Sequence, residues 1–438
     1  MEGFQCVVPY HTYSLGHVML FVSLVLSAAT SMRGTSRVME MVMASLSLPC
    51  PAPSWFAGRL WLLRLGYYKL TRAQEHADDW AWIVDHTVQL GAEKCFVILG
   101  IRLSALPPAG RCLSHEDVEP LALVPVKASN GEVVWQQLEA TIEKTGVPRA
   151  IIGDHGSDLK AGVDRFCQKH PETRAIYDIK HKTAAVLKQE LHADETWQEF
   201  TRLATQTKRK IQQTAFAFLA PPNQRAKARY MNIEPLIRWG RNLLVCFDTQ
   251  SLKGHAELDQ QLLEEKLGWI RRFREQLHAW GALLQMIEVT ENFVRRQGLY
   301  HGCHLALHKQ LLVHAHTERT KKVCTHLVTF VLEESLKAKP SERLLGSSEV
   351  IESVFGKLKR LEQDQAKSGF TGLLLSVAAM VSTTTREVMH KALETVSTKH
   401  VRAWCKKTLG QSVQAKRREA FASHKETEQK WDQFEVAV

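Results

Sequence analysis

Two aspartates in this chain each come directly after a short apolar run. Asp85 follows Ala81-Trp-Ile-Val, and Asp154 follows Ala150-Ile-Ile-Gly. Such runs predict strands that end at the aspartates, so each carboxylate stands at the lip of a sheet, where it can reach a ligand. A single strand-end aspartate more often ends a strand or caps a turn. Two of them on adjacent strands need a counter-charge, which a hard divalent cation such as Mg²⁺, with its preference for oxygen ligands, supplies.

A third carboxylate is predicted on a late helix. Glu349 and Glu352 lie three residues apart behind a serine that fits a helix cap, so both can face the same side of one helix. We favour Glu352 because it stands seven residues before Lys359, which places the two side chains on one face two turns apart. Glu349, near the helix start, is explained as a partner of the helix dipole and cap.

Three residues close to these aspartates in the sequence are also candidate metal ligands. Asp158, four residues after Asp154, is best explained by stabilising the N-terminus of the helix that follows. His86 and His155 directly follow the two aspartates. Since adjacent side chains on a strand point to opposite faces, we leave both histidines out of the expected set of metal ligands.

The elements that position these residues follow from the pattern between residues 80 and 180. Apolar, β-branched runs and helical stretches alternate in the order βββ-α-β-α-β, which predicts a mixed sheet with helices on both faces. Pro120 and Pro125 lack ladder donors and favour an edge position for the third strand. The predicted elements span 81–85, 94–103, 118–126, 131–145, 148–154, 157–170 and 174–179.

The rest of the chain reads as helical. From His181 to about residue 338 apolar residues recur at helical spacing, including a long run over 257–297, and helices continue from Ser347 to the C-terminus. The first 75 or so residues predict small helices. The apolar stretch 18–29 is shorter than the ~20 residues that span a bilayer and predicts a core helix. Residues 32–40 are either part of a DNA-docking helix-turn-helix or a structural cap.

The charge of the chain indicates its class of binding partner, and its cysteines indicate the redox compartment in which it works. Lys plus Arg number 57 against 46 Asp plus Glu, with a calculated pI near 9.2, which favours a polyanionic partner but also fits a merely basic surface. The nine cysteines form no CxxC pair and indicate reduced thiols in a cytosolic protein.

Clusters of basic residues are the candidates for DNA contact, with a solvated helix face or ordinary ion pairing as the alternative. Between residues 208 and 229 no Asp or Glu occurs, His181 and Lys182 follow the last predicted strand, and three cations extend the helix of Glu352. The predicted DNA-binding residues are His181, Lys182, Lys208, Arg209, Lys210, Arg225, Lys227, Arg229, Lys357, Lys359 and Arg360. Trp197, Trp239, Trp269 and Trp280 predict an apolar core, with base stacking as the less expected role.

Three strings resemble the motifs of bacterial insertion-sequence transposases with an Asp-Asp-Glu triad. They are Trp82-Ile-Val-Asp85, Ile151-Ile-Gly-Asp154 and Ile351-Glu352-Ser-Val-Phe-Gly-Lys-Leu-Lys359. The resemblance covers roughly residues 78–365, and its ribonuclease-H-like topology agrees with the strand order derived above. It implies that Asp85, Asp154 and Glu352 are both the catalytic residues and the ligands of two Mg²⁺ ions, with Mn²⁺ as a substitute.

The same resemblance implies cutting of transposon-end DNA and joining of the freed 3′-hydroxyl to target DNA, without a covalent enzyme intermediate. It also implies double-stranded DNA as partner, a homodimer on paired ends, no membrane, and a cytoplasmic, nucleoid-associated location. One departure is informative, since nearly half the chain separates Asp154 from Glu352. An all-helical insertion fills this gap, whereas many related transposases carry β-rich ones.

The expected fold is therefore an α/β ribonuclease-H-like mixed sheet core with a large all-α insertion and helical N- and C-terminal parts. The expected segments are 1–77 (helical, with a possible DNA-binding role), 78–180 (first part of the core), 181–340 (insertion), 341–368 (core helix with the catalytic Glu) and 369–438 (C-terminal helices). Two other functions stay open: a degenerate or repurposed DNA-binding protein that has lost catalysis, and a metal-dependent nuclease that cuts without joining.

Overall fold

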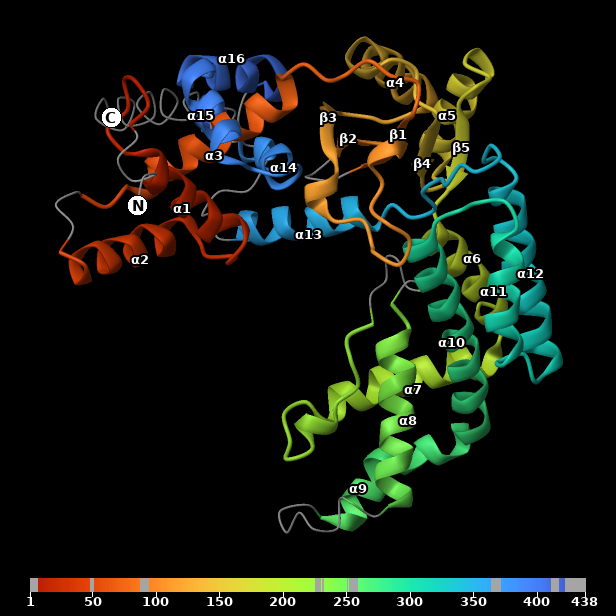
Figure 1. The fold of residues 1–438 in the computed structure, drawn as a ribbon. Coiled ribbons are helices and arrows are strands. Elements are labelled where there is room, and N and C mark those ends of the chain that lie inside the picture. Colours follow the sequence, from red (N-terminus) through yellow and green to blue (C-terminus); the bar gives the residue numbers. More distant parts are fainter. Residues whose placement is uncertain are drawn as a thin grey trace, which may run out of the picture. The chain divides into compact units, whose positions relative to one another are not determined.

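The chain divides into two compact units in a computed structural model (Figure 1). Unit 1 consists of Met1–Pro108, Cys112–Ala175 and Ser348–Val438, and unit 2 of Ala109–Arg111 and Ile176–Ser347. The structure describes residues 7–47, 51–86, 94–224, 230, 232–249, 251, 259–363, 372–410 and 417–421.

A five-stranded sheet with the order β3-β2-β1-β4-β5 forms the core of the fold. β1 pairs antiparallel with β2 and parallel with β4, while β2 pairs antiparallel with β3. This mixed arrangement confirms the predicted ribonuclease-H-like fold, and β3 lies at the edge, as Pro120 and Pro125 indicated. The strands span Trp80–His86 (β1), Lys94–Arg102 (β2), Glu119–Val126 (β3), Ala150–Gly153 (β4) and Arg174–Tyr177 (β5).

Two helices, α4 (Gly131–Thr145) and α5 (Ser157–Lys169), cover one face of this sheet. Trp82 and Val84 of β1 pack in one buried cluster with Val134 of α4 and Phe166 of α5. Because side chains alternate along a strand, Ala81, Ile83 and Asp85 point to the opposite face. The alternation of side chains along β1 that buries Trp82 thus also sets the direction of the Asp85 side chain.

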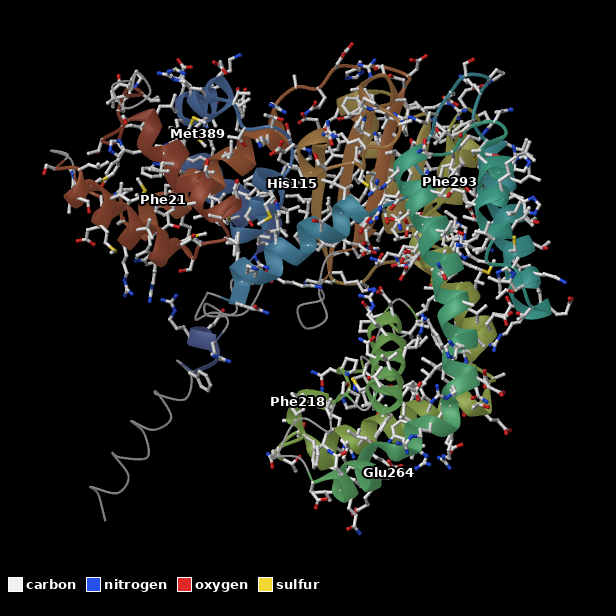
Figure 2. All side chains as sticks on the ribbon, turned by 60° about the horizontal axis from the view of Figure 1, so that its bottom comes forward. Phe21, His115, Phe218, Glu264, Phe293 and Met389 are labelled. Carbon is white, nitrogen blue, oxygen red and sulfur yellow. The ribbon has the colours of Figure 1, made fainter. Side chains whose placement is uncertain are left out.

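Helices from both ends of the chain make up the rest of unit 1. The predicted core helix over 18–29 is present as α1 (Leu15–Leu26), which starts three residues earlier and ends three residues earlier than predicted. Phe21 lies on this helix (Figure 2). Its ring packs so closely on Gly58 that a Cβ there would lie 1.9 Å from it. Among the described residues no helix is both long and apolar enough to cross a membrane. These helices are α1 (Leu15–Leu26), α2 (Met32–Ser45), α3 (Trp55–Thr71), α13 (Glu349–Gln363), α14 (Leu375–Met380), α15 (Arg386–Thr395) and α16 (Thr398–Leu409).

A buried lysine joins α3 to α14. The Lys69 ammonium donates to the carbonyls of Val381 and Ser382 and to the Thr384 hydroxyl, each at 2.7 Å. Burial lowers its pKa to about 7, and the oxygen acceptors offset part of the cost of removing the group from water. One turn earlier, Gly66 lets the backbones meet, since a Cβ there would lie 2.0 Å from the Leu375 carbonyl oxygen. The ammonium therefore satisfies carbonyls beyond the α14 C-terminus.

Apart from the last two residues of β5 and an isolated bridge between Leu299 and Leu344, the described elements of unit 2 are helices, as predicted for the insertion. The run over 257–297 is not one helix, because a 3₁₀ segment, Gly268–Phe273, separates α9 (Gln260–Leu267) from α10 (Arg274–Gln297). Residues 257 and 258 lie outside the described residues. Trp197 and Trp280 are each 1% exposed and 5.0 Å apart between ring centroids, which fits the predicted core. The helices are α6 (Ile179–Leu191), α7 (Glu195–Ile211), α8 (Glu234–Asp248), α9 (Gln260–Leu267), α10 (Arg274–Gln297), α11 (Cys303–Leu312) and α12 (Glu318–Ser335).

Candidate active site

Asp85 and Asp154 come to the same edge of the sheet. The parallel register of β1 and β4 pairs Ile83 with Ile152 and Val84 with Gly153, so one further step places Asp85 opposite Asp154. Neighbouring strands lie about 4.8 Å apart, and residues paired in register point to the same face. Both aspartates are half-buried. The register therefore brings Asp85 and Asp154 to neighbouring positions at one edge of the sheet.

Backbone amides hold one oxygen of each carboxylate. The His86 amide donates to Asp85 Oδ1 (2.6 Å), and the Gly156 amide donates to Asp154 Oδ1 (3.0 Å). Gly156 lies between two carboxylates, because a Cβ added there would stand 3.1 Å from Asp154 Oδ1 and 3.4 Å from Asp158 Oδ1. Both aspartates thus have a fixed orientation before any ligand binds.

Glu352 lies on a helix that packs against β1. α13 buries a stripe of apolar residues and contacts β1. Because α4 and α5 already cover one face of the sheet, we infer that α13 packs on the other face. Glu349 and Glu352 both lie in its first turns and are both half-buried. Across the described residues, no group of three or more His, Cys, Asp and Glu is close enough to hold a metal ion. The apolar stripe is Val350, Ile351, Val354, Phe355, Leu358 and Leu361.

A polar network that we did not predict lies behind Asp85. His86 Nε2 is 2.9 Å from Ser129 Oγ and 3.9 Å from an Asp158 carboxylate oxygen, and its ring packs on Phe96. Burial lowers the pKa of His86, and Asp158 opposes this. Burial would raise the pKa of Asp158, but the Ser129 hydroxyl and His86 outweigh it and leave that pKa below its usual range. Because the His86 amide holds Asp85, this network fixes the end of β1.

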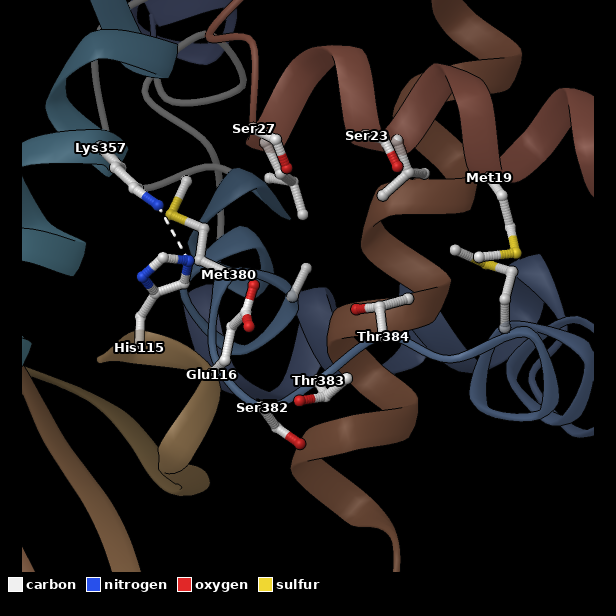
Figure 3. A pocket seen from close by; sticks show the side chains of 14 residues that line it. Met19, Ser23, Ser27, His115, Glu116, Lys357, Met380, Ser382, Thr383 and Thr384 are labelled. Atoms are coloured by element: carbon white, nitrogen blue, oxygen red, sulfur yellow. Dashed lines mark hydrogen bonds between the residues drawn. The ribbon is translucent and has the colours of Figure 1, made fainter. Parts of the chain in front are cut away.

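The predicted DNA contact Lys357 is engaged inside unit 1. Its ammonium donates to His115 Nε2 (3.1 Å), in a cavity of about 210 Å³ whose lining also includes Glu116 and the hydroxyls of Thr383 and Thr384 (Figure 3). His115 accepts this bond only when neutral. Burial and the neighbouring Lys357 both lower the pKa of His115. The pair ties α13, the helix of Glu352, to the 3₁₀ turn before β3 (His115–Asp117).

Acid is expected to weaken the fold through His115. Its folded-state pKa lies below the usual value of about 6.5, so between those two values the unfolded chain binds a proton that the folded chain does not. Stability therefore rises with pH across this window and is lost as pH falls through it. We expect His115→Gln, which keeps an acceptor for Lys357, to lose less stability than the wild type between about pH 7 and 5, by a few tenths to about 1 kcal/mol.

Urea unfolding of the two proteins across that range is the measurement. His11, His17 and His86 also have lowered pKa values, but they are present in both proteins, so the difference between the two pH profiles reports on His115 and the neighbouring lysines Lys69 and Lys357. Parallel pH profiles for the two proteins would contradict the prediction.

The remaining predicted DNA contacts are divided between the units. Lys359 and Arg360 are exposed on α13 in unit 1. In unit 2, Lys182 lies 5.1 Å from the Phe330 ring, and Lys208 donates to Asn223 Oδ1 (2.5 Å). His181 is in the first turn of α6, Arg209 and Lys210 are exposed in the last turn of α7, and Arg225, Lys227 and Arg229 lie outside the described residues.

Comparison with solved structures finds a similar fold in a transposase complex. The chain is similar to the Drosophila P element transposase strand transfer complex, with 10% sequence identity and a TM-score of 0.40, over 90% of this chain and 94% of that chain. No protein-family model and no curated protein matches the sequence.

Proposed function

We propose that this chain is a DNA transposase that cuts transposon ends and joins them to target DNA. The observation that carries the proposal is the register of β1 and β4, which puts Asp85 beside Asp154 at one edge of a ribonuclease-H-like sheet. Glu352 lies on the helix that packs against the same strand β1. The order of the three carboxylates along the chain is that of the Asp-Asp-Glu motif, with a large helical insertion between the second and the third.

The chemistry of the donors fits a hard divalent ion, although the described residues do not bring three such donors within metal-binding distance of one another. Carboxylate oxygens are the ligands that Mg²⁺ prefers, and Mn²⁺ accepts them too. Within the described residues, the only hydrogen bond of the Asp154 carboxylate is the one from the Gly156 amide to Oδ1, so Oδ2 is available to a ligand. Asp85, Asp154 and Glu352 would hold two ions, which when bound lower the pKa of the nucleophile and stabilise the leaving oxygen.

The chain's own residues supply orientation in this mechanism. The His86 and Gly156 amides hold the two aspartates at fixed angles, so little reorganisation is needed when DNA arrives. The hydrogen bond from Lys357 to His115 holds α13 in place, and with it Glu352. The exposed Lys359 and Arg360, farther along α13, would bind the DNA backbone near the reacting phosphate.

Several finer features belong to the same proposal. They are a homodimer on paired ends, contacts from His181, Lys182 and the 208–229 cations to DNA, and a bacterial insertion-sequence origin. The two other functions, a binding-only protein and a nuclease without joining, share the fold and the basic charge. They differ in the products formed from DNA, which makes them distinguishable in one assay.

The assay uses a labelled DNA fragment that carries the end of the element encoding this chain, together with an unlabelled plasmid as target. We expect cleavage at the element end and joined products with Mg²⁺ or Mn²⁺, and neither with EDTA. Cleavage without joining would replace the proposal by a nuclease. Binding to the fragment without any cleavage would replace it by the binding-only protein.

A further inference from the structure

Helix α16 (Thr398–Leu409) in the C-terminal part of unit 1 has an unusual charge pattern. Its twelve residues include four cations and no Asp or Glu. Lys399, Arg402 and Lys406 follow each other at i, i+3 and i+7, which places them within about 60° of one another on the helix surface. All three are exposed. A row of cations therefore runs along one side of this helix.

The opposite side of α16 is fixed to the fold. Val401 is buried, Trp404 and Cys405 are half-buried, and α16 packs against α3 (Figure 1). The His400 ring stacks on Tyr67 of α3, with 6.3 Å between centroids. The Ser397 hydroxyl also caps the helix start by accepting from the His400 amide. Since the packed side is anchored, the row of cations is held on a rigid surface.

These cations have no carboxylate partners. Within the described residues, Lys399, Arg402 and Lys406 take part in no ion pair, whereas Lys160, Arg238 and Lys321 on other helices each pair with a nearby carboxylate. An unpaired row of like charges is electrostatically costly for the free protein and favours a polyanionic partner. The formal net charge of the chain, +11, acts in the same direction.

We propose that the Lys399–Arg402–Lys406 face of α16 binds the phosphate backbone of duplex DNA. From Lys399 to Lys406 the helix rises about 10 Å, and one strand of duplex DNA carries a phosphate about every 3.4 Å of its axis, so three cations meet about three phosphates. No large apolar side chain of α16 is exposed, and a helix lying on a membrane needs such a face. Duplex DNA therefore fits this face better than a lipid surface.

The inference rests on the proposed function. It adds a second DNA-contact surface to the one proposed for Lys359 and Arg360 on α13. The test compares wild type with the triple variant Lys399→Gln, Arg402→Gln, Lys406→Gln, using a short duplex of arbitrary sequence as the probe. Each lost phosphate contact lowers the slope of log K against log salt by about 0.9, so we expect a loss of about 2.7.

The matched control changes two lysines and one arginine that have acidic partners: Lys160→Gln, Arg238→Gln, Lys321→Gln. It removes the same charge, and its salt slope should stay near that of the wild type. A further variant, Lys399→Arg, Arg402→Lys, Lys406→Arg, should keep the wild-type slope because it keeps the charges. Circular dichroism melts verify that all variants fold.

A triple variant whose slope equals that of the control overturns the inference, even if cleavage by the wild type has been demonstrated. If the triple variant has a lowered slope but the wild type cuts no DNA, the surface is supported and only the transposase proposal is defeated. Vesicles with phosphatidylserine are the second probe. If the triple variant loses vesicle binding while its DNA slope is unchanged, the partner is an anionic membrane and the inference is wrong.

Discussion

Replacing Asp154 with asparagine is expected to lower the rate of DNA cleavage about a thousandfold. The change keeps the side-chain shape and an acceptor for the Gly156 amide, but removes the negative charge beside Asp85. Stabilisation by a bound ion amounts to several kcal/mol in the transition state, and each 1.36 kcal/mol corresponds to a factor of ten. The rate should be measured with saturating Mg²⁺ and with Mn²⁺, on the labelled element end.

Asp158→Asn is the matched control, because it removes the same charge four residues away. Its carboxylate interacts with Ser129 and His86 instead, so its cleavage rate should stay within about tenfold of the wild type. Calorimetric titration with Mn²⁺ alone separates ligand loss from a folding defect: Asp154→Asn should bind the ion more weakly while its melting curve is unchanged. Equal rates for the two variants would move the metal site toward Asp158.

Glu352→Gln is expected to cause a loss of similar size, whereas Glu349→Gln should change cleavage by less than about tenfold. Both glutamates are half-buried in the first turns of α13. The two variants make the same chemical change, so a difference in cleavage rate reports on the position of the carboxylate. Glu349 is the first residue of α13, where a carboxylate stabilises the helix dipole by about 0.3–1 kcal/mol.

Thermal melts of the two glutamate variants complete this comparison. We expect a small drop in stability for Glu349→Gln with activity kept, and lost activity with stability kept for Glu352→Gln. The reverse pattern would make Glu349 the third ligand, with Glu352 as the residue that supports the helix.

The parts of this protein that follow local rules were predictable from sequence. The apolar runs predicted the ends of β1 and β4 to within one residue of Asp85 and Asp154. The bounds of α4 were predicted to the residue, and in the structure Asn130 caps its start and Gly146 follows its last turn. The edge position of β3 followed from two prolines. Each of these signals depends on a few neighbouring residues, so it can be read directly from the sequence.

Contacts between distant residues were not predictable in the same way. The bond between His115 and Lys357 joins residues 242 positions apart, and Ser129 meets His86 across 43 positions. Lys357 was expected on DNA because its helix looked basic, and no sequence signal indicated the histidine beside it. Likewise Gly268 and Trp269 lie in an unbroken helical pattern, yet packing turns this stretch into a 3₁₀ segment.

The two ends of the inserted unit meet each other. The Ile179 amide donates to the Gly346 carbonyl (2.9 Å), and Leu299 bridges to Leu344. An open loop of this length would add entropy to the cost of bringing α13 to β1, about 0.6 kcal/mol for each doubling. Once unit 2 has folded, the effective loop between β5 and α13 is short. The insertion therefore closes its own loop, and we expect length changes that leave unit 2 folded and keep the Ile179–Gly346 hydrogen bond to have little effect on assembly of the sheet.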